Sequence, residues 1–137
     1  MTKALRPMWY LACPYSHPSE KIRKARFQAV SRVCGELMKK GIVAFSPITH
    51  NHPVKKLVEL PSTWEFWLGF DFEFLRRSEK LIVLRLPRWN ESTGVTKEIE
   101  EANECGIEID YIDPLPIDVA ILTALEAEYQ REISMPS

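Results

Sequence analysis

Short apolar runs alternate with helical segments along this chain, and the alternation constrains the fold more than any other feature. The apolar runs occupy residues 8–13, 42–47, 80–86 and 107–112. Helical patterns occupy residues 22–38, 62–77, 93–105 and 117–133. Strands that alternate with helices are typical of an open parallel sheet wrapped by helices. We therefore predict an α/β fold with a parallel sheet of four to five strands.

Length and charge narrow the class of protein. A chain of 137 residues matches a single domain, which we place at residues 1–137 with its core at 8–112 and a C-terminal helix at 117–133. The 18 basic and 19 acidic residues give a net charge of -1. No global field therefore attracts a nucleic-acid polymer or an anionic membrane surface. No window reaches about 18 consecutive apolar residues, so we expect no membrane-spanning segment.

The cysteines and the N-terminal segment bear on the compartment. Cys13, Cys34 and Cys105 are odd in number, far apart and set among apolar residues, which is typical of free thiols rather than disulfides. We expect a reducing compartment and a cytoplasmic location. The start "MTKALRPMWYLAC" is basic, but its apolar run is too short for a signal peptide and predicts a strand instead.

The predicted topology indicates where a ligand binds. In open parallel sheets, ligands bind beyond the C-terminal ends of the strands. Here that edge comprises the segments 13–19, 46–53, 86–94 and 112–116, all of which we predict to be loops. We therefore expect the residues of a binding site to lie in and beside these four segments.

The stretch "WNESTGVTKEIEEA" carries several carboxylates, of which Glu98 has an unusual position. It lies three residues after Val95 and four before Ala102, on the shoulder of the apolar stripe and one turn inside the predicted helix. Burial there raises the pKa of a carboxyl, while the helix N-terminus favours its charged form. Glu98 either flanks the stripe and reaches water, or serves as a nucleophile or base that faces the cleft.

A second carboxylate, Asp71, lies in the middle of an apolar helical stripe. The other members of this stripe are Trp64, Trp67, Leu68, Phe74 and Leu75. An unpaired carboxylate among aromatic side chains is costly or becomes neutral. Asp71 is therefore paired with a buried arginine, caps a loop, or serves as a general acid near neutral pH. Two carboxylates in opposite environments indicate glycosidic or glycosyl-transfer chemistry.

Other polar and aromatic residues have weaker patterns. His50 and His52 have no third ligand nearby in sequence, so we predict no metal site. The chain contains neither a Gly-x-Gly-x-x-Gly motif nor a Walker phosphate loop. The sequence therefore does not indicate binding of ATP or of a dinucleotide. Tryptophans such as Trp64, Trp67 and Trp89 belong to the core or stack on a nucleobase. Tyr10 points into the core or into the cleft.

Four motifs together resemble a known superfamily. They are "YLACPYSHP", "SPITHNHP", the segment from Trp64 to "EKLIVL", and "LPRWNESTGVTKEIEEA". This combination resembles the nucleoside 2-deoxyribosyltransferase-like superfamily, and within it the DUF1937 branch. The resemblance covers about residues 8–112 and implies a flavodoxin-like parallel sheet. It also implies cleavage of the N-glycosidic bond of a (deoxy)nucleoside or nucleoside 5′-monophosphate, through a glutamate nucleophile and a glycosyl-enzyme intermediate.

The resemblance assigns roles to individual residues. Gly94 and Glu98 match a Gly-x-x-x-Glu motif that carries the nucleophile. Asp71 matches the aspartate that assists the departing base, and Tyr10 matches the tyrosine that orients the nucleophile. Ser92 matches the serine that contacts the 5′-phosphate in some members. The further residues that we expect to contact substrate are Ser16, His17, Asn51 and Trp89.

The chain also departs from the family pattern. Its first loop, "CPYSHP", lacks the glycines of the monophosphate hydrolases, so the phosphate requirement stays open. The acid with which transferases hold the sugar hydroxyls has no clear match. The resemblance implies no metal or organic cofactor, and it implies a homodimer or larger homo-oligomer. The alternative function is a non-catalytic nucleotide-binding sensor.

Overall fold

The computed structural model describes residues 4–136, so both limits of the predicted domain, residues 1 and 137, lie outside the described residues. The helices and strands confirm the predicted alternation. In chain order they are β1 (Met8–Ala12), α1 (Glu20–Lys39), β2 (Val43–Phe45), α2 (Pro47–Leu57), α3 (Trp64–Arg76), β3 (Lys80–Leu84), the 3-10 turn η1 (Trp89–Glu91), α4 (Thr93–Glu104), β4 (Glu108–Ile112) and α5 (Pro116–Ser134).

The strands form one parallel sheet in the order β2-β1-β3-β4. In the register, Tyr10 of β1 lies between Phe45 of β2 and Leu81 of β3. The sheet starts at β1 and extends in both directions, so the chain reverses its direction of winding between β1 and β3. This is the open parallel sheet that the alternation predicted, with the flavodoxin-like arrangement that the family resemblance implied. The reversal places a crevice at the C-terminal ends of β1 and β3.

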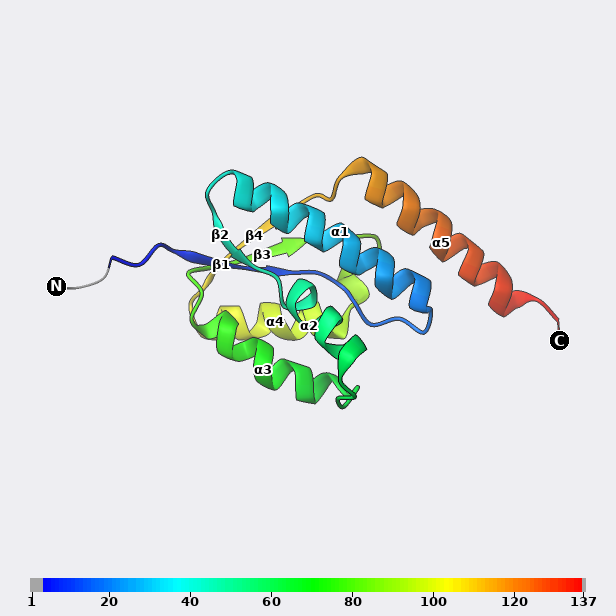
Figure 1. Cartoon of the computed structure of the whole chain (residues 1–137), viewed down its shortest axis with the longest axis horizontal. Helices are drawn as coiled ribbons and strands as arrows, with labels where there is room; N and C mark the ends of the chain where they lie inside the picture. The colour runs from blue at the N-terminus through cyan, green and yellow to red at the C-terminus, as the bar shows by residue number, and fades with distance from the viewer. Residues whose placement is uncertain (1–3, 137) are drawn as a thin grey trace.

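Helices cover both faces of the sheet (Figure 1). Helices α1 and α5 pack together on one face, and α3 and α4 pack together on the other. Side chains of β1 alternate between the two cores, and the alternation continues into the next residue. Leu11 and the following Cys13 contact the α1 side, whereas Tyr10 and Ala12 contact the side of α3 and α4. Each residue of β1 therefore has a defined face, and Tyr10 faces the helix that carries Glu98.

The segment that follows β2 is a helix, α2, and not the loop that we predicted for residues 46–53. Ser46 caps it by accepting a hydrogen bond from the Thr49 amide at 3.1 Å, and Pro47 occupies the first turn, where proline is favoured. Pro53 lies inside the helix, where it removes one backbone hydrogen bond. The interior proline made the segment resemble a loop, although the Ser-Pro pair before it is a helix-start pattern.

Strand β2 is shorter and more exposed than the apolar run of residues 42–47 indicated. It is an edge strand of three residues, and Val43 is 37% exposed. The pattern of apolar residues cannot distinguish an edge strand from a central one, because the order of strands in the sheet determines which neighbours each strand has. Within residues 4–136, no helix combines the length and the apolar character that a membrane crossing requires.

An ion pair between a buried carboxylate and a partly exposed arginine holds the start of α5 against α1. The Asp118 side chain is 2% exposed and accepts from Arg32, whose Nε lies 3.1 Å from Oδ2 and whose Nη2 bonds Oδ1. Asp118→Ala is expected to lower the free energy of unfolding by about 2–3 kcal/mol, because it removes a charge-assisted bidentate pair. Urea unfolding measures this. The matched control Glu36→Ala breaks an exposed pair with Lys39 and should change stability by less than about 0.5 kcal/mol; equal effects would contradict the prediction.

Candidate active site

A pocket of about 340 Å³ opens at the C-terminal edge of the sheet. Its walls come from the loop after β1, from α2, from the first half of α3 and from the start of α4. Six of the residues selected from the sequence line it: Ser16, Asn51, Asp71, Ser92, Gly94 and Glu98. The fold thus brings together residues that are up to 82 positions apart, from Ser16 to Glu98.

Glu98 is buried at the base of this pocket. Val95 and Ala102, on the same face of α4, are 1% and 0% exposed. Because Glu98 shares this buried face, it is also buried, with 5% of its surface exposed. The hydroxyl of Tyr10 donates a hydrogen bond to Oε2 of Glu98. Burial raises the pKa of Glu98 to about 8, and the hydrogen bond from Tyr10 opposes this while the charge of Asp71 adds to it.

Tyr10 is a fixed donor to this carboxylate. Its side chain is fully buried in β1, and burial together with the charge of Glu98 raises the pKa of its phenol well above the ordinary value of 10.0. The phenol therefore keeps its proton throughout the neutral range. A donor that is always protonated favours the ionised form of Glu98 and holds its orientation.

Asp71 is the second carboxyl with a raised pKa in the pocket. Burial raises its pKa to about 6, while a hydrogen bond from Asn51 lowers it. Nδ2 of Asn51 donates to Oδ1 of Asp71 at 3.0 Å, and Oδ1 of Asn51 lies 2.7 Å from Nδ1 of His50. Asp71 is thus paired with an amide of α2 and not with an arginine, which leaves it able to exchange a proton near neutral pH.

The apolar stripe of α3 is only partly buried. Leu75 is 0% exposed and packs on the sheet, whereas Trp64 is 47% exposed and Phe74 is 37% exposed. Helix α3 leads into β3, so its first turns project past the C-terminal edge of the sheet, where Trp64 and Trp67 line the pocket. Asp71 therefore lies where the helix passes from the core to the pocket.

The first turn of α4 forms another wall. Oγ of Ser92 accepts a hydrogen bond from the Val95 amide at 3.2 Å and donates to no acceptor among residues 4–136, so its proton can bond a ligand oxygen. A Cβ built on Gly94 would have Ser92 Oγ as its nearest contact, at 3.8 Å. Glycine is therefore not required by the packing here, and its lack of a side chain leaves space at a helix N-terminus, a position that favours anions.

Sequence reasoning missed two residues of the pocket wall, Tyr15 and Lys55. Lys55 lies over the rings of Tyr15 and Trp67, at 5.1 and 5.2 Å from their centroids, and the hydroxyl of Tyr15 lies 2.7 Å from Nδ1 of His52. These residues line the pocket with Asn51. The spacing of four between Asn51 and Lys55 would have revealed this wall, had residues 47–57 been recognised as a helix.

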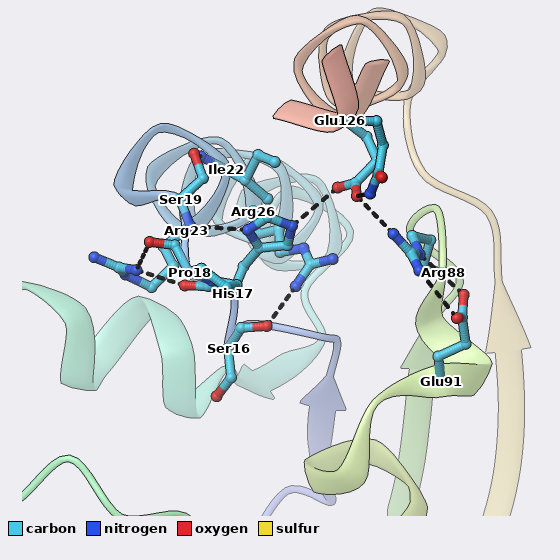
Figure 2. Close-up of polar contacts among 11 residues, drawn as sticks. Ser16, His17, Pro18, Ser19, Ile22, Arg23, Arg26, Arg88, Glu91 and Glu126 are labelled. Atoms are coloured by element: carbon cyan, nitrogen blue, oxygen red, sulfur yellow. Dashed lines mark hydrogen bonds and ion pairs between the residues drawn. The ribbon is translucent and has the colours of Figure 1, made fainter. Parts of the chain in front are cut away.

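His17 and Trp89 lie elsewhere and are not among the residues that line the pocket. Nδ1 of His17 accepts from the Ser19 amide at 2.9 Å, and Nε2 lies 3.1 Å from Glu126 of α5 (Figure 2). The indole of Trp89 packs on Tyr111, with 5.6 Å between ring centroids. Across the part of the chain that the structure describes, no three His, Cys, Asp or Glu side chains gather as a metal site would require.

Comparison with known proteins identifies the family. The model of a protein family described as "Domain of unknown function (DUF1937)" matches residues 7–112. A search of curated proteins gave no match. The matched region includes all four strands and every wall of the pocket. The chain therefore belongs to the DUF1937 family.

Proposed function

We propose that the protein cleaves, or transfers at, the N-glycosidic bond of a (deoxy)nucleoside or nucleoside 5′-monophosphate. The observation that carries the proposal is the buried pair of Glu98 and Tyr10, which opens on a pocket with a second carboxyl, Asp71. The resemblance of the same residues to the nucleoside 2-deoxyribosyltransferase-like superfamily supports it. Both carboxyls have raised pKa values, which is typical of groups that exchange protons or attack substrates.

In the first step, the ionised carboxylate of Glu98 attacks C1′ of the sugar. A bond forms between a carboxylate oxygen and C1′, and the bond from C1′ to the base nitrogen breaks. Asp71 donates its proton to the departing base and becomes a carboxylate. Tyr10 holds Glu98 in the orientation for attack through its hydrogen bond.

In the second step, water or another nucleobase attacks C1′ of the glycosyl-enzyme intermediate. The bond between C1′ and Glu98 breaks, and the carboxylate is regenerated. The carboxylate of Asp71 takes the proton that the incoming nucleophile loses, which returns both residues to their starting states. Hydrolysis and transfer thus differ only in the nucleophile that resolves the intermediate.

The walls of the pocket suit the parts of such a substrate. A volume of about 340 Å³ falls within the range of small-molecule sites. The indoles of Trp64 and Trp67 lie beside Asp71 on α3 and offer apolar surfaces for a base. The first turn of α4, with the free proton of Ser92 and the open space at Gly94, offers donors for the sugar or a phosphate.

Release of free base tests the proposal. The protein is incubated with deoxynucleosides, ribonucleosides and their 5′-monophosphates, with and without a second free base, and base release is followed by chromatography. Turnover of at least one substrate is expected. Saturable binding without turnover of any of them would contradict the proposal and favour a nucleotide sensor.

The pH dependence of base release is expected to be bell-shaped. The reactive form has Glu98 ionised and Asp71 protonated, so the pair together holds one proton. Because the pKa values are raised to about 6 for Asp71 and about 8 for Glu98, the pair holds one proton between about pH 6 and 8, and that proton resides mostly on Glu98. The reactive arrangement, with the proton on Asp71, is a minor tautomer of this singly protonated pair, so its population rises and falls with that of the pair. Activity should fall on both sides of that window, as kcat/KM measured across pH will test. A profile that is flat from pH 5 to 9 would contradict the assignment.

A further inference from the structure

We propose that Glu126 of α5 is a positioning residue that clamps the two loops that frame the pocket. These are the β1 loop, which follows β1 (residues 13–19), and the β3 loop, which follows β3 (residues 85–92). Glu126 lies outside residues 7–112, the part that matches the family. The kinetic part of this proposal rests on the proposed function, whereas its structural part does not.

The β3 loop is connected to Glu126 through Arg88. Nη1 of Arg88 donates to Oε1 of Glu126 at 2.6 Å, while Nε and Nη2 donate to the two oxygens of Glu91 at 3.0 and 3.2 Å. Glu91 itself lines the pocket. Arg88 thus joins a wall of the pocket to α5 by a run of charge-assisted hydrogen bonds. The bond to Glu126, which is 18% exposed, is better shielded from water than the bonds to Glu91, which is 58% exposed.

The backbone of Arg88 adopts an unfavourable conformation at this connection. Its φ of 68° is the only positive φ of a non-glycine residue among residues 4–136. A side chain with a Cβ adopts this left-handed conformation only at an energetic cost. The attraction between the guanidinium and its two carboxylate partners offsets this cost. The backbone bend at Arg88, which directs the chain toward Ser92, therefore depends on these two carboxylates.

The β1 loop is connected to the other oxygen of the same carboxylate. Nε2 of His17 lies 3.1 Å from Oε2 of Glu126, and Nδ1 of His17 accepts from the Ser19 amide, so Nε2 carries a proton and donates (Figure 2). His17 is next to Ser16, which lines the pocket. Arg26 fixes the same loop from α1, since its Nη1 donates to the Ser16 carbonyl at 2.9 Å.

The carboxylate is held in place to serve both loops at once. The Glu126 side chain is 18% exposed, and Nε2 of Gln130, one turn later on α5, donates to it at 3.1 Å. Figure 2 shows Glu126 between His17 and Arg88, with its side chain extending down from α5 at the top of the view. Each carboxylate oxygen binds one loop. Removal of this single side chain should therefore loosen both loops together, although Arg26 still holds the Ser16 carbonyl of the β1 loop.

The clamp acts on the walls of the pocket and not on its reacting group. Ser16 and Glu91 lie on the two clamped loops, whereas Glu98 is held by Tyr10 on the opposite face of the sheet from α5. Loosening the loops should therefore weaken substrate binding more than it slows the chemical step. For Glu126→Ala we expect KM to rise about tenfold, equivalent to ~1.4 kcal/mol, with kcat within about twofold.

Backbone hydrogen exchange of the full chain, without substrate, tests the clamp. Glu126→Ala should exchange faster than wild type in both loops while β1 and β3 keep their protection. Glu126→Gln keeps the volume but has one acceptor oxygen, so it should release one loop only. The control Glu128→Ala, on the same helix, removes a carboxylate whose one ion pair within the described residues is with the exposed Lys21, and it should leave both loops unchanged. Unchanged exchange in either loop of Glu126→Ala, or equal loosening throughout the sheet, would overturn the proposal.

The kinetic measurement separates this inference from the proposed function. If the wild-type protein releases no base from any substrate, the proposed function fails, and the exchange experiment still decides whether Glu126 clamps the loops. If the wild type is active, a rise in KM with little change in kcat supports the positioning role. A fall in kcat at unchanged KM would contradict it, because it would place the effect of Glu126 on Glu98 instead of on the pocket walls.

Discussion

Replacement of Glu98 by glutamine is expected to abolish base release, with kcat/KM falling by at least about 10³-fold. The amide retains the volume of the carboxylate and an oxygen that accepts from Tyr10, but it cannot form the ester bond to C1′. Initial rates of base release measure the loss. Binding of the nucleoside should persist, since the substitution leaves the aromatic and α4 walls intact; a variant with more than a tenth of wild-type activity would contradict the assignment.

The stability of the same variant provides its control. Burial raises the pKa of Glu98 to about 8 in the folded protein from the ordinary 4.5, so the folded state binds more protons than the unfolded state between these values. Wild-type stability therefore carries a penalty that grows as pH rises from about 4.5 to 8. Glutamine has no such penalty. At pH 8 Glu98→Gln should unfold at a temperature equal to or above that of wild type, so loss of activity cannot be attributed to unfolding.

Replacement of Asp71 by asparagine is expected to lower kcat by about 10²- to 10⁴-fold for natural nucleosides, the usual range for removal of a general acid. Asparagine occupies the same space beside Asn51 but has no proton to give to the departing base. The fall in activity at high pH should also disappear, because that limb reflects the loss of the Asp71 proton. Activity should instead rise with pH through the pKa of Glu98.

The leaving group distinguishes acid catalysis from mere damage to the site. A 2-deoxyriboside with a nitrophenolate leaving group needs no proton on departure, so Asp71→Asn should cleave it at close to the wild-type rate. The control Glu73→Gln, an exposed residue of α3 paired with Arg77, should behave as wild type on every substrate. An equal loss on both kinds of substrate would contradict the general-acid role.

The sequence predicts the sheet well because alternation of apolar runs and helical periods is a local property. Each strand and most helices lie where their patterns place them, and the position of Glu98 follows from its spacing to Val95 and Ala102. Its hydrogen bond to Tyr10 joins residues 88 positions apart, and it became an expectation only through the family resemblance.

The loops and edges of the fold are less predictable for physical reasons. Helix α2 was not predicted because Pro53 resembles a helix breaker. The pocket wall that this helix forms, including Lys55, was therefore not predicted either. His17 lies in the loop after β1, where ligand-binding residues are expected. Its side chain nevertheless points to Glu126 on α5. The direction of a loop side chain depends on partners that are distant in sequence, and no period encodes it.

The proposal that Glu98 is a nucleophile is tested most directly by the mass of the intact protein during turnover. The wild-type protein is mixed with each active nucleoside or nucleotide, quenched in acid within the first turnovers, and digested to locate any added mass. We predict an adduct of one sugar, or sugar phosphate, on Glu98, and its absence from Glu98→Gln. An adduct on another residue, or one that persists in Glu98→Gln, would contradict the account.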